Sequence, residues 1–540
     1  MIQNKILRSV GRYTFPLIIF ILLSVSGSGQ NNKQDLSGVR KYSALLQMIK
    51  YAYVDTVNES KLVEKAIVET LKELDPHSMY ISKKDLKRAN EELVGNFEGI
   101  GVQFEIFRDT INIVHPIPGG PSERLGILSG DKIIKIEAEN VTGKKLTNQF
   151  VFDRLRGKKG TKVNVSIYRS GKKGLIDFAI VRDKIPINSI DASYIIDPGI
   201  GYINLTRFSS TSMNEFTEAM VKLKSQGIQS LILDLRNNGG GYMNTAIELA
   251  DQFVEGKKLI VYTEGRMSPR DDYYSTDKGI FEKGKLVIMI NENSASASEI
   301  VSGAVQDLDR GIIVGRRSFG KGLVQRPFQL PDSSEVRLTT ARYYTPSGRC
   351  IQKPYSEGVD KYYLDYSTRF KHGEMENSDS IKFPDSLKYR TSKGRIVYGG
   401  GGIMPDVFFP LDTTPFTDYF LNLRRKNVIN MFVGDYVDKS RKDLQKKFPD
   451  FELFDKKFII DDDFMKDFLS LAEKQGVKMN EKEYGLSERL IRSQIKSLIA
   501  QKLWDVNASF MIINREDHEV QKAIGVIKDD AAFDKPGIQR

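Results

Sequence analysis

Between residues 183 and 355, short apolar runs alternate with helical segments. The runs "GIGYINL", "SLILDLR", "KLVIMI" and "GIIVGR" indicate strands, while "FTEAMVKLKSQ" and "SEIVSGAVQDL" indicate helices between them. Strands joined through helices predict a partly parallel sheet, with functional loops at the carboxyl ends of its strands. Two further strands, "LVQRPFQL" and "EVRLTTARYY", meet at Pro331-Asp332, which is typical of a hairpin.

On either side of this region the pattern changes, so the 540-residue chain is expected to have a multidomain α+β fold. The predicted parts are a helical segment (31–92), a β-rich module (93–182), an α/β core (183–410) and a helical C-terminal extension (411–540). Within the core, residues 356–396 are polar and are expected to form an insertion or long loop.

Local signals refine this division. Asp75-Pro76 is expected to end a helix, another helix is expected to follow Pro121, and a third to span residues 147–156. In the C-terminal extension, "SERLIRSQIKSLIAQKLW" has one apolar face and is expected to begin at an N-cap formed by Ser487.

The first 30 residues have the pattern of a signal peptide. A positively charged start precedes an apolar run from Phe15 to Val25, and small residues follow it. Eleven residues in a helix span about half of a bilayer core, so a cleaved signal is favoured over an uncleaved membrane anchor, which remains the alternative. The chain is therefore expected to be exported to the periplasm or cell envelope. No cysteine follows the run, which excludes a lipoprotein.

Composition excludes several classes of protein. The net charge of +11 is spread among alternating acids and bases, and no basic block interleaved with aromatic residues indicates nucleic-acid binding. The single cysteine, Cys350, permits no intrachain disulfide and is expected to be structural. No histidine–cysteine or HExxH spacing indicates a metal site, and the chemistry predicted below needs neither a metal nor an organic cofactor.

Three short segments could carry chemistry, although each also has a plain structural interpretation. Ser296, in "INENSASASEI", follows a strand and opens a helix; serine there is also a common helix cap. Lys321, in "RRSFGKGLVQ", lies between glycines and, if buried, could be a neutral base or simply a turn lysine. The turn "LDLRNNGGGYM" could supply backbone N–H groups to an oxyanion or be only a turn.

Together the three segments fit acyl transfer by a serine activated by a lysine. A histidine-based triad fits poorly, because none of the four histidines lies between residues 183 and 355.

The segments "NENSASASEIVSGAVQD", "GRRSFGKGLVQ", "LDLRNNGGG" and "RYYTPSGRCIQ" resemble the carboxy-terminal processing peptidases, or tail-specific proteases. The resemblance implies that Ser296 is the nucleophile, Lys321 the general base and Gln325 a residue that orients the lysine. It assigns the oxyanion hole to the N–H groups of Ala297 and Gly240, with the choice among three consecutive glycines left open. It also implies a catalytic core like those of crotonase and Clp protease.

The β-rich module, through "FEGIGVQFE" and "PIPGGPSERLGILSGDKIIKIEAENVTG", looks like a PDZ domain of the same family. A PDZ domain adds a peptide as a strand and holds its free carboxylate on loop N–H groups, here expected at Glu98, Gly99, Ile100 and Gly101. A scaffold domain without peptide binding is the alternative. Arg156, in "RLRGKKGT", matches a position that senses PDZ movement and contacts the catalytic glutamine in some members; a plain structural arginine is the alternative.

The resemblance thus predicts a serine endopeptidase whose partners are proteins with exposed C-termini. Two rival functions remain, a catalytically inactive PDZ adaptor and a crotonase-like acyl-CoA enzyme. Asp307 is expected to have a structural role. Membrane association through an uncleaved N-terminal segment and assembly into a homo-oligomer remain open, as does the role of residues 411–540.

Overall fold

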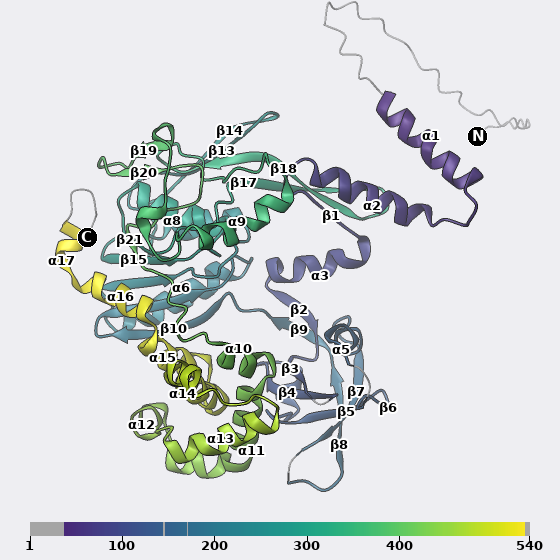
Figure 1. Cartoon of the computed structure of the whole chain (residues 1–540), viewed down its shortest axis with the longest axis vertical. Coiled ribbons are helices and arrows are strands. Elements are labelled where there is room, and N and C mark those ends of the chain that lie inside the picture. Colours follow the sequence, from purple (N-terminus) through teal and green to yellow (C-terminus); the bar gives the residue numbers. More distant parts are fainter. Residues whose placement is uncertain (1–36, 108, 144–145, 170, 535–540) are drawn as a thin grey trace, which may run out of the picture. The chain divides into compact units, whose positions relative to one another are not determined.

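The computed structural model describes residues 37–107, 109–143, 146–169 and 171–534, which divide into one unit up to Ala66 and a second from Ile67 onward. The predicted signal peptide lies outside the described residues. The first unit contains α1 (Ser37–Ala52) and the start of α2 (Glu59–Lys72) (Figure 1). None of the helices described is both long enough and apolar enough to cross a membrane.

The second unit is built around a six-stranded sheet. Its order is β10 (Ile190–Asp197), β11 (Ile200–Leu205), β12 (Ser230–Asp234), β15 (Lys285–Ile290), β16 (Ile312–Gly315) and β21 (Val407–Phe408). Every neighbouring pair from β11 to β21 is parallel, and only β10 runs antiparallel. The predicted partly parallel sheet is confirmed.

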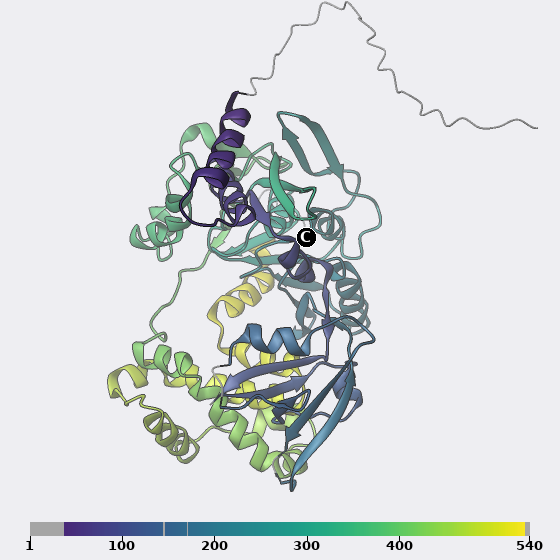
Figure 2. The same ribbon diagram turned by 90° about the vertical axis from the view of Figure 1, so that its right-hand side faces the viewer.

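Both faces of this sheet are buried. Along β15, Leu286, Ile288 and Ile290 pack in one core with α6 (Ser212–Ser225), α7 (Met243–Asp251) and α8 (Ala297–Asp307). Val287 and Met289 pack in another core with α16 (His518–Lys528) and α17 (Asp530–Asp534), which lie along the opposite face (Figure 2). Alternation within one strand explains both cores, because successive side chains point to opposite sides of a sheet.

An antiparallel sheet lies beside the first. It contains β1 (Met79–Ile81), β13 (Leu259–Gly265), β14 (Ser268–Tyr274), β17 (Leu323–Gln329) and β18 (Glu335–Tyr344). The predicted hairpin is confirmed, since β17 pairs with β18 across the turn at Pro331-Asp332. The hairpin of β13 and β14 was not predicted from the sequence.

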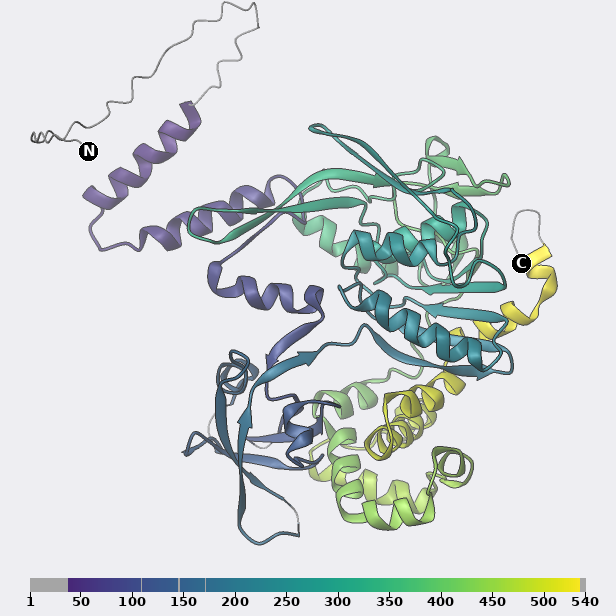
Figure 3. The ribbon, with the colours of Figure 1, turned by 180° about the vertical axis from the view of Figure 1, so that it is seen from behind.

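The β-rich module has its own sheet and core. Its strands are β3 (Val102–Phe107), β4 (Thr110–Pro116), β5 (Lys132–Ile136), β6 (Glu139–Asn140), β7 (Lys162–Tyr168) and β8 (Leu175–Val181). The two predicted helices are present as α4 (Pro121–Arg124) and α5 (Asn148–Leu155). The chain enters through α3 (Lys83–Val94) and β2 (Asn96–Gly99) and leaves through β9 (Asp183–Pro186), which pairs with β2 (Figure 3).

Most of the C-terminal helices share a separate apolar core. They are α10 (Asp418–Arg425), α11 (Val428–Lys447), α12 (Phe451–Lys457), α13 (Asp462–Lys474), α14 (Glu481–Leu503) and α15 (Val506–Glu516). The predicted cap at Ser487 is wrong. Helix α14 begins earlier, because Asn480 accepts a hydrogen bond from the N–H of Glu483, and Ser487 is a buried residue within the helix that donates to the carbonyl of Pro415.

The segment 356–396 is not a long loop. It contains α9 (Val359–Lys371), two short 3₁₀ turns (Ser378–Ser380 and Asp385–Leu387) and a hairpin of β19 (Lys388–Arg390) and β20 (Ile396–Tyr398). Its polar composition concealed an amphipathic helix, whose Tyr362 and Arg369 are buried against the core.

Candidate active site

Ser296 lies on a sharp turn between β15 and α8, as the sequence predicted. Its φ of +55° is in the left-handed region, which is costly for a residue with a side chain and is found where surrounding contacts enforce it. Those contacts include a 2.8 Å hydrogen bond from its N–H to Glu299 Oε2. The turn places Ser296 on the wall of a cavity at the carboxyl end of the parallel strands.

Glu299 joins the serine turn to the lysine loop. Its buried carboxylate also accepts hydrogen bonds from the N–H of Lys321 at 2.9 Å, the N–H of Gly320 at 2.7 Å and Ser318 Oγ at 2.5 Å. One side chain therefore fixes the backbone of both proposed reacting residues. Glu299 was not predicted as a site residue, although a carboxylate three residues after a serine at a helix start is the pattern of a capping box.

The electrostatics of the site favour a neutral lysine. Burial lowers the pKa of Lys321, while the charges of Glu299 and Asp75 oppose this shift. Burial also raises the pKa of Glu299 to about 7, although the four hydrogen bonds that its carboxylate accepts oppose this shift. Lys321 lines the same cavity as Ser296.

Asp75 and His77 lie behind the lysine, and the sequence analysis saw only a helix stop there. Burial and the positive charge of Lys321 lower the pKa of His77 to about 4. The imidazole is held by Tyr362 of α9, with 2.8 Å between Nε2 and the phenol oxygen. The Asp75 carboxylate accepts hydrogen bonds from the N–H groups of His77 and Ser78, each at 2.8 Å.

Gln325 is held at the bulge where β17 pairs with β18. Its Nε2 donates to Thr339 Oγ1 at 3.2 Å, and Thr339 Oγ1 donates to Asp75 Oδ1 at 3.1 Å. Gln325 thus lines the same cavity as Ser296 and Lys321, while its side chain is directed by Asp75 through Thr339.

The two predicted oxyanion donors differ in whether their N–H groups already have a hydrogen-bond acceptor in this structure. The N–H of Ala297, at the first position of α8, has no acceptor among the residues described. The N–H of Gly240 donates to Asn238 Oδ1 at 2.9 Å. Gly240 nevertheless packs directly against the serine turn, because an added Cβ would lie 2.9 Å from Ser296 Cβ, and its φ of +103° also favours glycine.

The cavity that contains Ser296 and Lys321 has a volume of about 560 Å³ and is partly apolar. Helix α3 contributes Asn90, Leu93 and Val94 to its wall, and Asn90 accepts a 2.7 Å hydrogen bond from Arg337. The volume is within the range of ligand sites and would hold part of an extended peptide.

A second cavity of about 340 Å³ lies in the β-rich module, between edge strand β3 and helix α5. Ile100 and Gly101 line one end of it, and neither N–H has a hydrogen-bond acceptor among the described residues. Glu98 and Gly99, the other two predicted carboxylate-binding residues, instead belong to β2, where Glu98 forms an ion pair with Lys87.

Arg156 lines this second cavity and does not contact Gln325. Its guanidinium pairs with Glu91 of α3 and lies over the rings of Phe97 and Phe152, at 4.6 and 4.4 Å from their centroids. Helix α3 therefore contacts Arg156 through Glu91 and the active-site cavity through Asn90.

Asp307 has the structural role that was predicted. It is fully buried, pairs with Arg349 at 2.7 Å and accepts hydrogen bonds from Thr345 and from the N–H of Ser347. Burial raises the pKa of Cys350, which makes its thiol a poor nucleophile. In the described part of the chain, no group of three His, Cys, Asp or Glu side chains could hold a metal ion.

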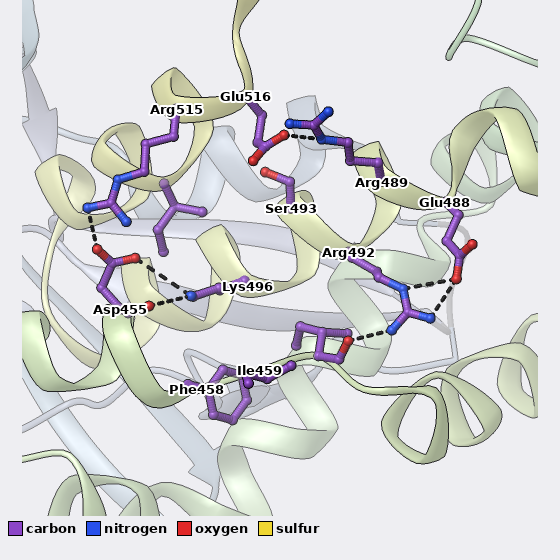
Figure 4. A pocket seen from close by; sticks show the side chains of 12 residues that line it. Asp455, Phe458, Ile459, Glu488, Arg489, Arg492, Ser493, Lys496, Arg515 and Glu516 are labelled. Atoms are coloured by element: carbon purple, nitrogen blue, oxygen red, sulfur yellow. Dashed lines mark hydrogen bonds and ion pairs between the residues drawn. The ribbon is translucent and has the colours of Figure 1, made fainter.

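A further hollow, of about 530 Å³, lies among α12, α14 and α15 (Figure 4). Four cationic side chains line it, and each is already paired with a carboxylate, as in the pair of Arg515 with Asp455 and that of Arg489 with Glu516. It lacks a nucleophile with a free base, so the chemistry belongs to the cavity at Ser296.

Three family models match parts of the chain. The family model of Peptidase family S41 matches residues 199–361, a PDZ domain model matches 99–180, and a family of unknown function matches 419–505. A carboxy-terminal-processing protease of Bartonella bacilliformis is 34% identical over 357 residues, which cover 65% of this chain and 81% of the relative. The chain belongs to the carboxy-terminal processing proteases.

Other relatives extend further along the chain. The carboxy-terminal processing protease CtpA of Bacillus subtilis is 31% identical over 449 residues, covering 80% of this chain and 92% of that protein. Among solved structures, a photosystem II D1 C-terminal processing protease is 26% identical and covers 68% of this chain and 86% of its own, with a TM-score of 0.35. This protein is therefore a serine peptidase with a PDZ domain and a C-terminal helical region.

Proposed function

We propose that this carboxy-terminal processing protease cleaves exported proteins whose C-terminal tails are bound by its PDZ domain, through a Ser296–Lys321 acyl-enzyme mechanism. The observation that carries the proposal is Glu299, whose single carboxylate binds the backbone of both Ser296 and Lys321 in one cavity. We also propose that the protein is exported to the periplasm or cell envelope. We propose further that its catalytic core is like those of crotonase and Clp protease.

The first half of the reaction forms an ester. Neutral Lys321 takes the proton of Ser296 Oγ as that oxygen attacks the carbonyl carbon of the scissile peptide bond. The charge on the carbonyl oxygen is stabilised by the N–H of Ala297 and by that of Gly240, which has to turn away from Asn238 or be shared with it. The carbon–nitrogen bond then breaks, and the protonated lysine returns its proton to the leaving amine.

Water completes the cycle. Lys321 takes a proton from the attacking water, the ester bond to Ser296 breaks, and the proton passes to the serine oxygen. Gln325, held through Thr339 and Asp75, keeps the lysine amine directed into the cavity. Glu299 and Asp75 both raise the pKa of Lys321. Because the lysine must be neutral to act as a base, their effect on its pKa has to stay smaller than the effect of burial.

Substrate selection lies in the PDZ domain. A peptide carboxylate would bind the N–H groups at Ile100 and Gly101, and its chain would extend edge strand β3 beside α5. Glu98 and Gly99 remain part of the predicted binding region. We propose that Arg156 reports occupancy of this groove through Glu91 of α3, since α3 also lines the catalytic cavity.

The test compares Ser296→Ala and Lys321→Ala with the wild-type protein. Activity is measured on a protein substrate with a free C-terminus and on the same substrate with a C-terminal amide. Both variants are expected to lose at least about 10³-fold in kcat while remaining folded, because nucleophile and base act as one unit. The amide is expected to raise KM more than it lowers kcat.

Each part of the proposal can fail separately. Full activity in either variant would exclude the dyad. Wild-type protein that binds the free C-terminus but cleaves nothing would favour the PDZ adaptor instead. Equal cleavage of free and amidated substrates would exclude selection by the carboxylate.

A further inference from the structure

Three loops carry the proposed chemistry, and each contains a buried or largely buried charged residue close in sequence to its functional group. Arg236 follows β12 and precedes the glycine turn that contains Gly240. Glu292 follows β15 and precedes Ser296. The third, Arg316, follows β16 and precedes Lys321 in the same way.

Two residues from the C-terminal end of the fold, Asp517 and Glu519, contact this set, and of the two only Glu519 reaches two of its members. Glu519, in the first turn of α16, accepts a hydrogen bond from Arg236 Nη1 at 2.9 Å through one carboxylate oxygen. Its other oxygen accepts from Arg316 Nη1, and Arg316 Nε donates to Glu292 at 2.8 Å. Glu519 thus links the glycine turn, the serine turn and the lysine loop.

These contacts are shielded from water. The side chains of Arg316, Glu292, Glu519 and Arg236 expose 4%, 7%, 13% and 15% of their surface. Exposed ion pairs contribute little, but removing one partner of a buried pair leaves an uncompensated charge that forces its neighbours to move. The neighbours here are the backbones that position Ser296, Lys321 and Gly240.

The two arginines depend on Glu519 to different degrees. Arg236 also pairs with Asp234 at 2.7 Å and with Asp517 at 2.9 Å, so two other carboxylates hold it. Arg316 forms ion pairs only with Glu292 and Glu519 among the residues described. Loss of Glu519 would therefore act mainly through Arg316 and the loop that carries Lys321.

We propose that Glu519 is a positioning residue for proteolysis, acting through Arg316 and Arg236 to keep the three catalytic loops aligned, so that activity depends on α16 being docked on the sheet. This inference rests on the proposed function and assigns a catalytic consequence to part of the C-terminal helical region. Helix α16 lies against β15 and β12 (Figure 1). The hydrogen bonds of Glu519 to Arg236 and Arg316 place it at the loops that leave the sheet.

The test uses Glu519→Gln in the full chain, with Asp530→Asn as a matched control. Asp530 comes from the same C-terminal end and pairs with Lys285 at 2.6 Å, but Lys285 is at the start of β15, away from the catalytic loops. Glu519→Gln is expected to lower kcat by about 10- to 100-fold with KM within about twofold. Asp530→Asn is expected to change neither by more than about twofold.

A structural role alone would give a different result. We expect Glu519→Asp, which keeps the charge, to recover part of the lost kcat, and the double variant Glu519→Gln/Arg316→Gln to lose no more than the larger single loss. The rate at which a fluorophosphonate labels Ser296 should fall in parallel with kcat. Additive losses, or a kcat loss that only follows the fraction of unfolded protein, would overturn the inference.

If Glu519→Gln does not fold, Glu519→Asp is used in its place. A kcat equal to that of the wild type in Glu519→Asp would count against a positioning role for Glu519. The proposed function fails separately. If the wild-type protein shows no cleavage that depends on Ser296, the dyad is wrong; if it does and Glu519→Gln cleaves equally well, only the role of Glu519 is wrong.

Discussion

The two faces of the parallel sheet are covered by helices of different character. Helices α6, α7 and α8 cover one face, and α8 begins at the serine turn within a recognisable motif. Helices α16 and α17 cover the other face with ordinary apolar residues and carry no motif. The proposed reacting groups thus come from the first face, while we propose that the second supplies part of the scaffold on which their loops rest.

The largest effect is expected on the first face, from Glu299→Gln. One of its two oxygens becomes an amide nitrogen, so two of the four donors that it now accepts would lose their acceptor. At roughly 1.5–3 kcal/mol for each charged hydrogen bond, kcat should fall about 10³-fold. Steady-state kinetics with a thermal unfolding curve would measure this.

Ser302→Ala is the control for that variant. Ser302 is buried in the same helix, but its hydroxyl donates only to the carbonyl of Ser298 within α8. We expect wild-type kcat. If both variants lose activity equally, Glu299 acts by supporting the helix and not by joining the two loops.

On the second face, Phe533→Ala tests whether a residue that only covers the sheet affects stability without affecting activity. The ring is buried, and Lys285 Nζ lies 5.2 Å from its centroid, near the start of β15 and away from the catalytic loops. Truncation should lower the free energy of unfolding by about 3 kcal/mol, with kcat of the folded enzyme unchanged. Chemical denaturation measures the stability, and kinetics at low temperature measure kcat. A fall in kcat would show that packing near the start of β15 affects the loops at its carboxyl end.

A smaller effect concerns pH. His77 has its pKa lowered to about 4 in the folded protein by burial and by Lys321. Between about pH 4 and 6.5 the unfolded chain binds more protons at this histidine, so its contribution to stability is lost as pH falls through that window. His77→Gln should remove roughly 1–2 kcal/mol of this acid destabilisation.

Denaturant unfolding at pH 7 and pH 5 measures the difference, with His372→Gln as the control because His372 is exposed at the end of α9. Equal pH dependence in both variants would show that His77 is not a source of acid sensitivity. A full effect from His77 would place an acid-sensitive residue beside Lys321, the proposed base.

Sequence patterns predicted the parts of the molecule that depend on local chemistry. The parallel strands, the β17–β18 hairpin and the serine at the start of α8 all follow from periodicity and turn residues in short segments. The resemblance added roles for Ser296, Lys321 and Gln325, which the structure places on one cavity. Their catalytic roles remain predictions.

What could not be predicted depends on contacts between distant segments. The capping pattern of Glu299 is local, but its hydrogen bonds to the lysine loop are not. Asp75 reads as a helix stop, although its carboxylate also reaches Thr339 of β18. Likewise, nothing in the pattern of α16 distinguishes a helix of the C-terminal cluster from one that covers the catalytic sheet.

The cover on the second face also has a consequence for the order of folding. Strand β15 and the serine turn are synthesised well before α16 and α17, so the nascent chain carries all of its catalytic motifs while one side of their sheet is still bare. Such long-range closure is slow, since the intervening chain must first be ordered. A chain that ends before α16 would thus carry every motif and still leave Val287 and Met289 without their apolar cover, so we expect it to fold incompletely.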